Sequence, residues 1–236
     1  MALPKLNENP QFELTVPSMN KLVHFRPFLV KEEKVMLMAM ESNDQKHILK
    51  TIVNTIDACV EEDLDVSRLT TFDVEYCFLQ IRSKSVGETS KIKLECKECK
   101  TENEVTININ DIKINVPKLE SMVELTKDIH VELAWPSFEN VLSNNVVDAK
   151  SEVDQAFNLI RSSIVAIQTN EERFLARDHK KGELDDFVES MTQDQFAKLR
   201  NYIEQMPRLK HDVNFCCMNC AASNTITVEG MQSFFS

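Results

Sequence analysis

Four cysteines of the chain form two pairs with identical spacing: Cys96 with Cys99, and Cys217 with Cys220. Two thiolates separated by two residues can turn back onto one ion and occupy two corners of a tetrahedron, so two such pairs can supply a closed site of four sulfurs. A closed site leaves no open position for a substrate. We therefore predict that these four cysteines bind one structural Zn²⁺.

The sequence leaves two alternatives to this site open. Cysteine also behaves as a small hydrophobic residue, so the pairs could be unrelated core residues. Cys216 directly precedes the second pair and could replace Cys217 as the fourth ligand. Lys100 and Ala221 follow the two pairs, at the position where many zinc ribbons have a glycine. The equal spacing of the pairs favours Cys217.

Strand-like segments flank both pairs, which is the arrangement that a zinc ribbon requires. Residues 91–95 precede the first pair and residues 213–215 precede the second. Further segments rich in Val, Ile and Thr follow each pair, as expected for the return strand of a hairpin. We predict two hairpins that together form one split zinc ribbon, from residues 91–116 and 209–230.

The region before the ribbon, residues 1–90, is predicted to combine a hairpin with helices. Residues 11–29 alternate apolar and polar side chains around a Pro-Ser-Met-Asn turn, which is typical of two antiparallel strands. Leu22, Phe25 and Phe28 are the apolar residues expected beyond the turn. The segment thus predicts a β-hairpin as the entry to an N-terminal α+β region.

Two helices are predicted to follow this hairpin. The first covers residues 31–40, with Val35, Met38 and Ala39 spaced for a buried stripe. Its methionines would also suit an adaptable surface for a partner protein. The second covers residues 44–60 and has apolar residues at helical spacing along its whole length.

Residues 117–208, between the two halves of the ribbon, are predicted to form a mainly helical insertion. Three helices are expected to begin near Ser151, Glu183 and Thr192, the last with a capping box. The first of them is expected to bury one face, made by Val153, Phe157, Ile160 and Ile164. The predicted fold class is therefore α+β: an N-terminal hairpin plus helices, a split four-cysteine zinc ribbon, and a helical insertion between its halves.

The composition excludes several classes of function. The formal net charge of −11 argues against the broad positive surface that nucleic-acid binding requires. Only three glycines are present, and they lie too far apart for a phosphate-binding loop. The five histidines form no His-Glu-x-x-His motif. We therefore predict a protein that is not an enzyme.

Targeting features are absent from the sequence as well. No apolar run approaches the ~18 residues of a membrane span, and the first residues contain no signal-peptide core. Seven cysteines without a secretory signal indicate thiols and metal in a reducing cytoplasm rather than a disulfide framework.

A third N-terminal helix carries the most distinctive sequence of the chain. Thr70 can cap it, with Asp73 three residues further on as a weak capping box. The string DVEYCFLQIRSKSVGE, residues 73–88, resembles a signature of the T4-type phage baseplate hub family. The resemblance implies a hub subunit or hub assembly protein of a contractile-tailed phage. It would act in the host cytoplasm during assembly and in the tail baseplate of the virion.

The same resemblance implies that the partners are other phage tail and baseplate proteins, and that the assembly sets the oligomeric state. A second reading remains open. A zinc ribbon with lysines around its first cysteine pair would also suit a cytoplasmic module that acts in nucleic-acid transactions, although the acidic net charge opposes it.

Overall fold

The computed structural model describes residues 10–42, 44–143, 151–230 and 233 of the chain. The chain divides into two compact units. The first comprises residues 1–66, 72–115 and 208–236, and the second comprises residues 67–71 and 116–207. Each unit mixes helices with antiparallel strands, so the predicted α+β class is confirmed.

The first unit begins with the predicted hairpin, in which β1 (Phe12–Val16) pairs antiparallel with β2 (Lys21–Phe25). Neighbouring side chains on a strand point to opposite faces, and the buried face of β2 holds Val23 and Phe25. Leu22, which we expected among the apolar positions of this strand, is 52% exposed because it lies on the other face.

Two helices follow, α1 (Val30–Glu41) and α2 (Gln45–Cys59), and Asp44 caps the second by accepting a hydrogen bond from the backbone of His47. The buried stripe predicted for α1 is wrong in two positions. Val35 is 52% and Met38 is 59% exposed, and of the expected stripe only Ala39 is buried.

A charged residue takes a buried position of this helix. Glu32 of α1 is 8% exposed; its carboxylate pairs with the guanidinium of Arg26 at 3.0 Å and accepts the backbone N–H of Leu29 at 2.7 Å. Ala39 lies seven residues further on, which is nearly two helical turns, so both share one face. Met38 lies off this face, whereas Val35, three positions after Glu32 and four before Ala39, lies towards it and is still half exposed.

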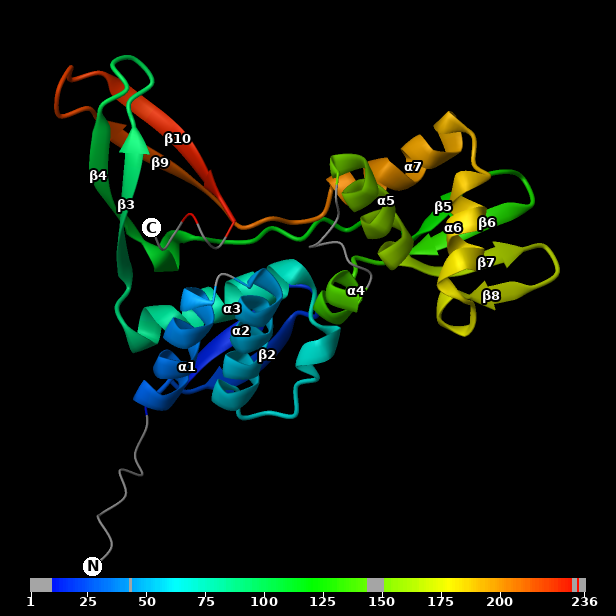
Figure 1. Ribbon diagram of the computed structural model, residues 1–236, viewed down its shortest axis with the longest axis horizontal. Coiled ribbons are helices and arrows are strands. Elements are labelled where there is room, and N and C mark those ends of the chain that lie inside the picture. Colours follow the sequence, from blue (N-terminus) through cyan, green and yellow to red (C-terminus); the bar gives the residue numbers. More distant parts are fainter. Residues whose placement is uncertain (1–9, 43, 144–150, 231–232, 234–236) are drawn as a thin grey trace, which may run out of the picture. The chain divides into compact units, whose positions relative to one another are not determined.

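The third helix, α3 (Thr71–Ser85), is the central element of the unit, because its buried residues point in several directions. One side packs against the ribbon, where Leu79 belongs to a core cluster with residues of all four ribbon strands or their ends. Those strands are β3 (Thr89–Glu95), β4 (Glu102–Asn108), β9 (Lys210–Cys216) and β10 (Ser223–Glu229). Figure 1 shows the two hairpins, β3–β4 and β9–β10, next to each other.

The second unit contains a four-stranded antiparallel sheet in the order β5-β6-β7-β8. Its strands are β5 (Met122–Glu124), β6 (Ile129–Leu133), β7 (Ile164–Thr169) and β8 (Arg173–Leu175). The helices of the unit are α4 (Phe138–Ser143), α5 (Glu152–Ser163), α6 (Lys181–Glu189) and α7 (Gln193–Glu204). The sheet adds a second layer that the expectation of a mainly helical insertion did not include.

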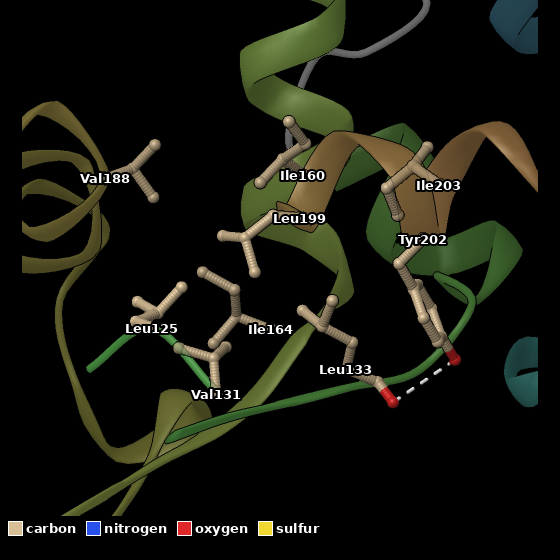
Figure 2. Close-up of a cluster of buried hydrophobic side chains, with 9 residues drawn as sticks. All are labelled: Leu125, Val131, Leu133, Ile160, Ile164, Val188, Leu199, Tyr202 and Ile203. Carbon is tan, nitrogen blue, oxygen red and sulfur yellow. Dashed lines mark hydrogen bonds between the residues drawn. The ribbon is translucent and has the colours of Figure 1, made fainter. Parts of the chain in front are cut away.

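The core of this unit lies between one face of the sheet and the helices α5, α6 and α7, as Figure 2 shows. Tyr202 of α7 reaches the end of β6 and donates its hydroxyl to the carbonyl of Leu133 at 3.3 Å. The buried face predicted for α5 is partly wrong: Val153 is 64% exposed, and Ile164 is the first residue of β7. Ile164 belongs to the sheet because it pairs with Leu133 of β6.

Candidate metal centre

Each cysteine pair lies in the turn of a hairpin, and the two turns have the same backbone hydrogen bonds. In the first, Cys96 N donates to Thr101 O at 2.9 Å and Lys100 N donates to Cys96 O at 3.0 Å. In the second, Cys217 N donates to Ala222 O and Ala221 N donates to Cys217 O, both at 2.9 Å. The local sequences thus fold into two matching knuckles.

Lys100 and Ala221 adopt the left-handed backbone conformation, with φ of 59° and 55°. This conformation lets the chain return to the hairpin after the second cysteine of each pair. It suits glycine, because a Cβ atom in this region costs roughly 1–2 kcal/mol. The knuckles therefore keep the usual turn of a ribbon without the glycine that usually makes it.

The two knuckles bring the four predicted ligands together. The Sγ atoms of Cys96, Cys99, Cys217 and Cys220 all lie within 4.8 Å of one another. Cys96 Sγ is 3.7 Å from Cys220 Sγ, and Cys99 Sγ is 3.5 Å from Cys217 Sγ. Four sulfurs at a Zn–S distance of about 2.3 Å stand about 3.8 Å apart in a tetrahedron, so the spacing fits zinc.

Cys216 is exposed and stands outside this group of sulfurs, whereas its neighbour Cys217 is buried. The alternation of β9 explains the difference, since consecutive side chains of a strand point to opposite faces. Cys96 is also buried, Cys99 is half-buried and Cys220 is exposed. One corner of the sulfur group therefore faces solvent.

Two buried asparagines connect the knuckles, and each is 2% exposed. Asn103 of β4 accepts the backbone N–H of Met218 at 2.8 Å, and Asn224 of β10 accepts the backbone N–H of Lys97 at 2.9 Å. The side-chain amide of Asn224 also donates to Cys96 Sγ at 3.4 Å. Asn103 and Cys217 Sγ form the equivalent contact at 3.7 Å.

Sequence reasoning missed this pair of asparagines. A signal was present, since each asparagine follows the first cysteine of its own pair by seven positions. Polar groups that hydrogen-bond to metal ligands orient these ligands and raise the affinity for the metal.

Hydrogen bonds favour the ionised form of the first pair of thiols. The side-chain and backbone bonds with Thr101 lower the pKa of Cys99 to about 5. Backbone bonds, the largest at Cys99, lower the pKa of Cys96. At Cys220, a backbone bond at Ala222 favours the thiolate, but bonds to the other cysteine sulfurs, the largest with Cys99, raise the pKa to about 12. A cation is needed before all four sulfurs can be charged together.

Cys59 and Cys77 have no such environment. Burial raises the pKa of Cys59 to about 11, and burial also raises the pKa of Cys77, which lies in α3. Both are core residues of helices. In the part of the chain that the structure describes, the four ribbon cysteines are the one group of three or more Cys, His, Asp or Glu ligands placed to share a metal.

A family model described as "T4 bacteriophage base plate protein" matches residues 9–236, which is nearly the whole chain. A search of curated proteins and a search of solved structures found no match. Within the described residues, no helix has both the length and the apolar character needed to cross a membrane.

Proposed function

Because this chain belongs to the T4 bacteriophage base plate protein family, we propose that it is a non-enzymatic protein of the baseplate hub in a contractile phage tail. The observation that carries the proposal is the extent of the family match, which covers both units and both halves of the ribbon. The resemblance of residues 73–88 to a signature of hub proteins supports the assignment to the hub. The protein is a structural subunit or an assembly factor there.

We propose further that Cys96, Cys99, Cys217 and Cys220 bind one structural Zn²⁺. Support comes from the spacing of their sulfurs, from the paired hydrogen bonds of Asn103 and Asn224, and from a closed donor set without a position for substrate. When bound, the ion would join chain segments that flank the whole of residues 117–208. Zinc would therefore hold the two halves of the ribbon together, while the rest of the chain provides surfaces for partners.

The proposed partners are other tail and baseplate proteins, met in the host cytoplasm during assembly and in the baseplate of the virion. Nucleic-acid binding is the alternative that a zinc ribbon would otherwise suggest. Around the first knuckle, however, Lys91 pairs with Glu104 at 2.7 Å and Lys93 with Glu102 at 3.8 Å, so lysines there already face carboxylates. With the net charge of −11, this supports the protein partners.

Co-expression with the other tail proteins of the same phage tests the proposal. We expect the tagged chain to co-purify with at least one baseplate protein, and a phage that lacks this gene to accumulate incomplete tails in electron micrographs. Complete, infectious tails without the gene product would contradict the proposal. Micromolar, salt-sensitive binding of the purified chain to DNA or RNA would favour the nucleic-acid alternative instead.

A further inference from the structure

A cavity of about 850 Å³ lies in the second unit, where α5 runs into β7 and β8 runs towards α6. Its size falls within the range of ligand pockets, roughly 300–1,000 Å³. None of the cysteines of the ribbon lines it, so it is separate from the candidate metal centre. The short segment that precedes α3, residues 67–68, completes its wall.

The wall of this cavity is cationic in a unit that is acidic. Residues 67–71 and 116–207 contain eleven Lys and Arg residues but seventeen Asp and Glu residues. The wall holds five of those cations and one of those carboxylates, Glu139. The five cations are Arg68, Arg161, Arg173, Arg177 and Lys181. Five of the eleven positive residues of the unit, but only one of its seventeen carboxylates, thus line this cavity.

Acidic side chains that pair with the arginines stand outside the lining. Asp185 pairs with Arg161, which is 7% exposed, and Glu132 pairs with Arg173. These ion pairs fix the orientation of the two guanidinium groups. A guanidinium has five N–H donors, so the ion pair of Arg173 with Glu132 leaves donors for a ligand.

Two cations of the wall are exposed and make no ion pair with any residue that the structure describes: Arg68 and Lys181. Lys181 is the first residue of α6, where the helix dipole adds partial positive charge. Both side chains can therefore attract an anionic ligand, and no ion pair within the described residues has to break first.

Apolar residues also line the cavity: Leu175 of β8 and Leu184 of α6. A ligand that fits must offer carboxylates to the arginines and aliphatic groups to this surface. We propose that the cavity binds an acidic segment of a partner protein in which Asp or Glu residues alternate with aliphatic residues.

Other anions fit the wall less well. Inorganic phosphate has no aliphatic groups for Leu175 and Leu184. A nucleic acid needs a longer positive surface than one cavity, and the net charge of the chain repels it. The proposal adds a binding surface to the structural role proposed above, but a measurement on the purified chain does not depend on that role.

Fluorescence anisotropy of a labelled peptide built from Glu, Asp and Leu tests the proposal. The matched control peptide carries Gln and Asn in place of Glu and Asp. The test variant of the full chain is Arg68→Glu with Lys181→Glu. The control variant, Lys118→Glu with Lys127→Glu, makes the same charge change at exposed lysines of the same unit outside the cavity.

We expect the acidic peptide to bind and its amide counterpart not to bind. The test variant should weaken binding at least about tenfold, because two attractions become two repulsions, and the control variant by less than about threefold. Arg68→Gln with Lys181→Gln should have an intermediate effect. Equal loss in the test and control variants, or no binding of the peptide, would overturn the proposal.

Stronger binding of single-stranded DNA or inorganic phosphate than of the peptide would overturn the assigned ligand class. All substituted residues are exposed, so thermal unfolding should be unchanged and would show whether a variant has lost its fold. The peptide-binding result does not depend on co-purification with baseplate proteins. Each of the two proposals can therefore be contradicted without the other.

Discussion

Asn103 and Asn224 are equivalent residues that exchange hydrogen bonds between the two knuckles. Asn103 accepts from Met218 N at 2.8 Å, and Asn224 accepts from Lys97 N at 2.9 Å. Residues 103 and 224 differ by 121 positions, as do residues 96 and 217. The paired residues of the two hairpins follow the same offset along seven positions of each strand. The ribbon is therefore built from two nearly equivalent halves.

Replacement of either asparagine should weaken both the fold and metal binding. Asn103→Ala and Asn224→Ala each remove the side-chain acceptor of a part-buried backbone hydrogen bond, which contributes about 0.5–1.5 kcal/mol. We also expect zinc affinity to fall about 10–100-fold, as for other groups that orient metal ligands. Urea unfolding and competition with a chromophoric chelator measure the two effects.

Asn214→Ala is the matched control for these variants. Asn214 lies on the neighbouring strand β9, is exposed and bonds to Thr225 Oγ1 at 2.7 Å. We expect a change in stability below about 0.5 kcal/mol. An equal loss in all three variants would show that the two buried asparagines have no special role.

The neighbours Cys216 and Cys217 should respond differently to substitution by serine. Purified protein should contain one zinc per chain by mass spectrometry, and Cys217→Ser should lose it because the tetrahedron is incomplete. Cys216→Ser should keep it, since its sulfur stands outside the group. Zinc at about 1,000 times its dissociation constant stabilises a fold by about 4 kcal/mol, so chelation should lower the unfolding temperature. Loss of zinc in Cys216→Ser alone would contradict this ligand set.

Glycine should stabilise both knuckles. Lys100 and Ala221 have φ of 59° and 55°, where a Cβ atom costs roughly 1–2 kcal/mol, whereas glycine loses only about 0.5–1 kcal/mol more entropy on folding. Lys100→Gly and Ala221→Gly should therefore each raise the free energy of unfolding by about 0.5–1 kcal/mol in urea titrations. Ala222→Gly, at a neighbouring position without a positive φ, is the control and should destabilise.

Stability should depend on pH through His24 and Glu62. A hydrogen bond with Glu62 is the main cause that raises the pKa of His24 above its ordinary value of 6.5. A group with a raised pKa stabilises the fold fully below its unfolded value, and this contribution is lost as pH rises through the folded value. His24→Gln should therefore lower the unfolding temperature at pH 6 and converge with the wild type above the raised pKa.

The same pair should also make the stability of the fold fall at low pH. The hydrogen bond with His24 lowers the pKa of Glu62 below its ordinary value of 4.5, so the contribution is also lost as pH falls through the lowered value. His47→Gln is the control, because His47 makes no ion pair with a residue that the structure describes. A constant difference between His24→Gln and wild type across this pH range would contradict the ion pair.

The exposed residues of α1 should tolerate polar substitution. Leu37 is 56% and Met38 is 59% exposed, so Leu37→Glu and Met38→Glu should change the free energy of unfolding by less than about 0.5 kcal/mol. Ile56→Ala, in the buried face of α2, should cost about 2–5 kcal/mol. A large loss in the α1 variants, measured by urea unfolding, would show that this surface is covered by another part of the chain.

Periodicity in the sequence predicted most elements, because spacing along one segment is enough to define a strand or helix. The helix that begins after Thr192 shows this: its capping box is present, with Gln195 N donating to Thr192 Oγ1 and Thr192 N donating to Gln195 Oε1. Periodicity alone did not predict correctly which face of each helix is buried. In α1 the buried position belongs to Glu32, because Arg26 supplies a partner from a different segment.

The sequence by itself determined the family resemblance, the α+β class and the two knuckles, since each depends on residues close together in the chain. Tertiary structure alone decided which residues meet across long separations. It brought the sulfur of Cys217, which the equal spacing of the pairs had favoured over Cys216, together with the other three. It also joined Asn103 and Asn224 to opposite knuckles and assembled the cationic cavity. Such contacts depend on packing between distant segments, and local spacing carries no record of that packing.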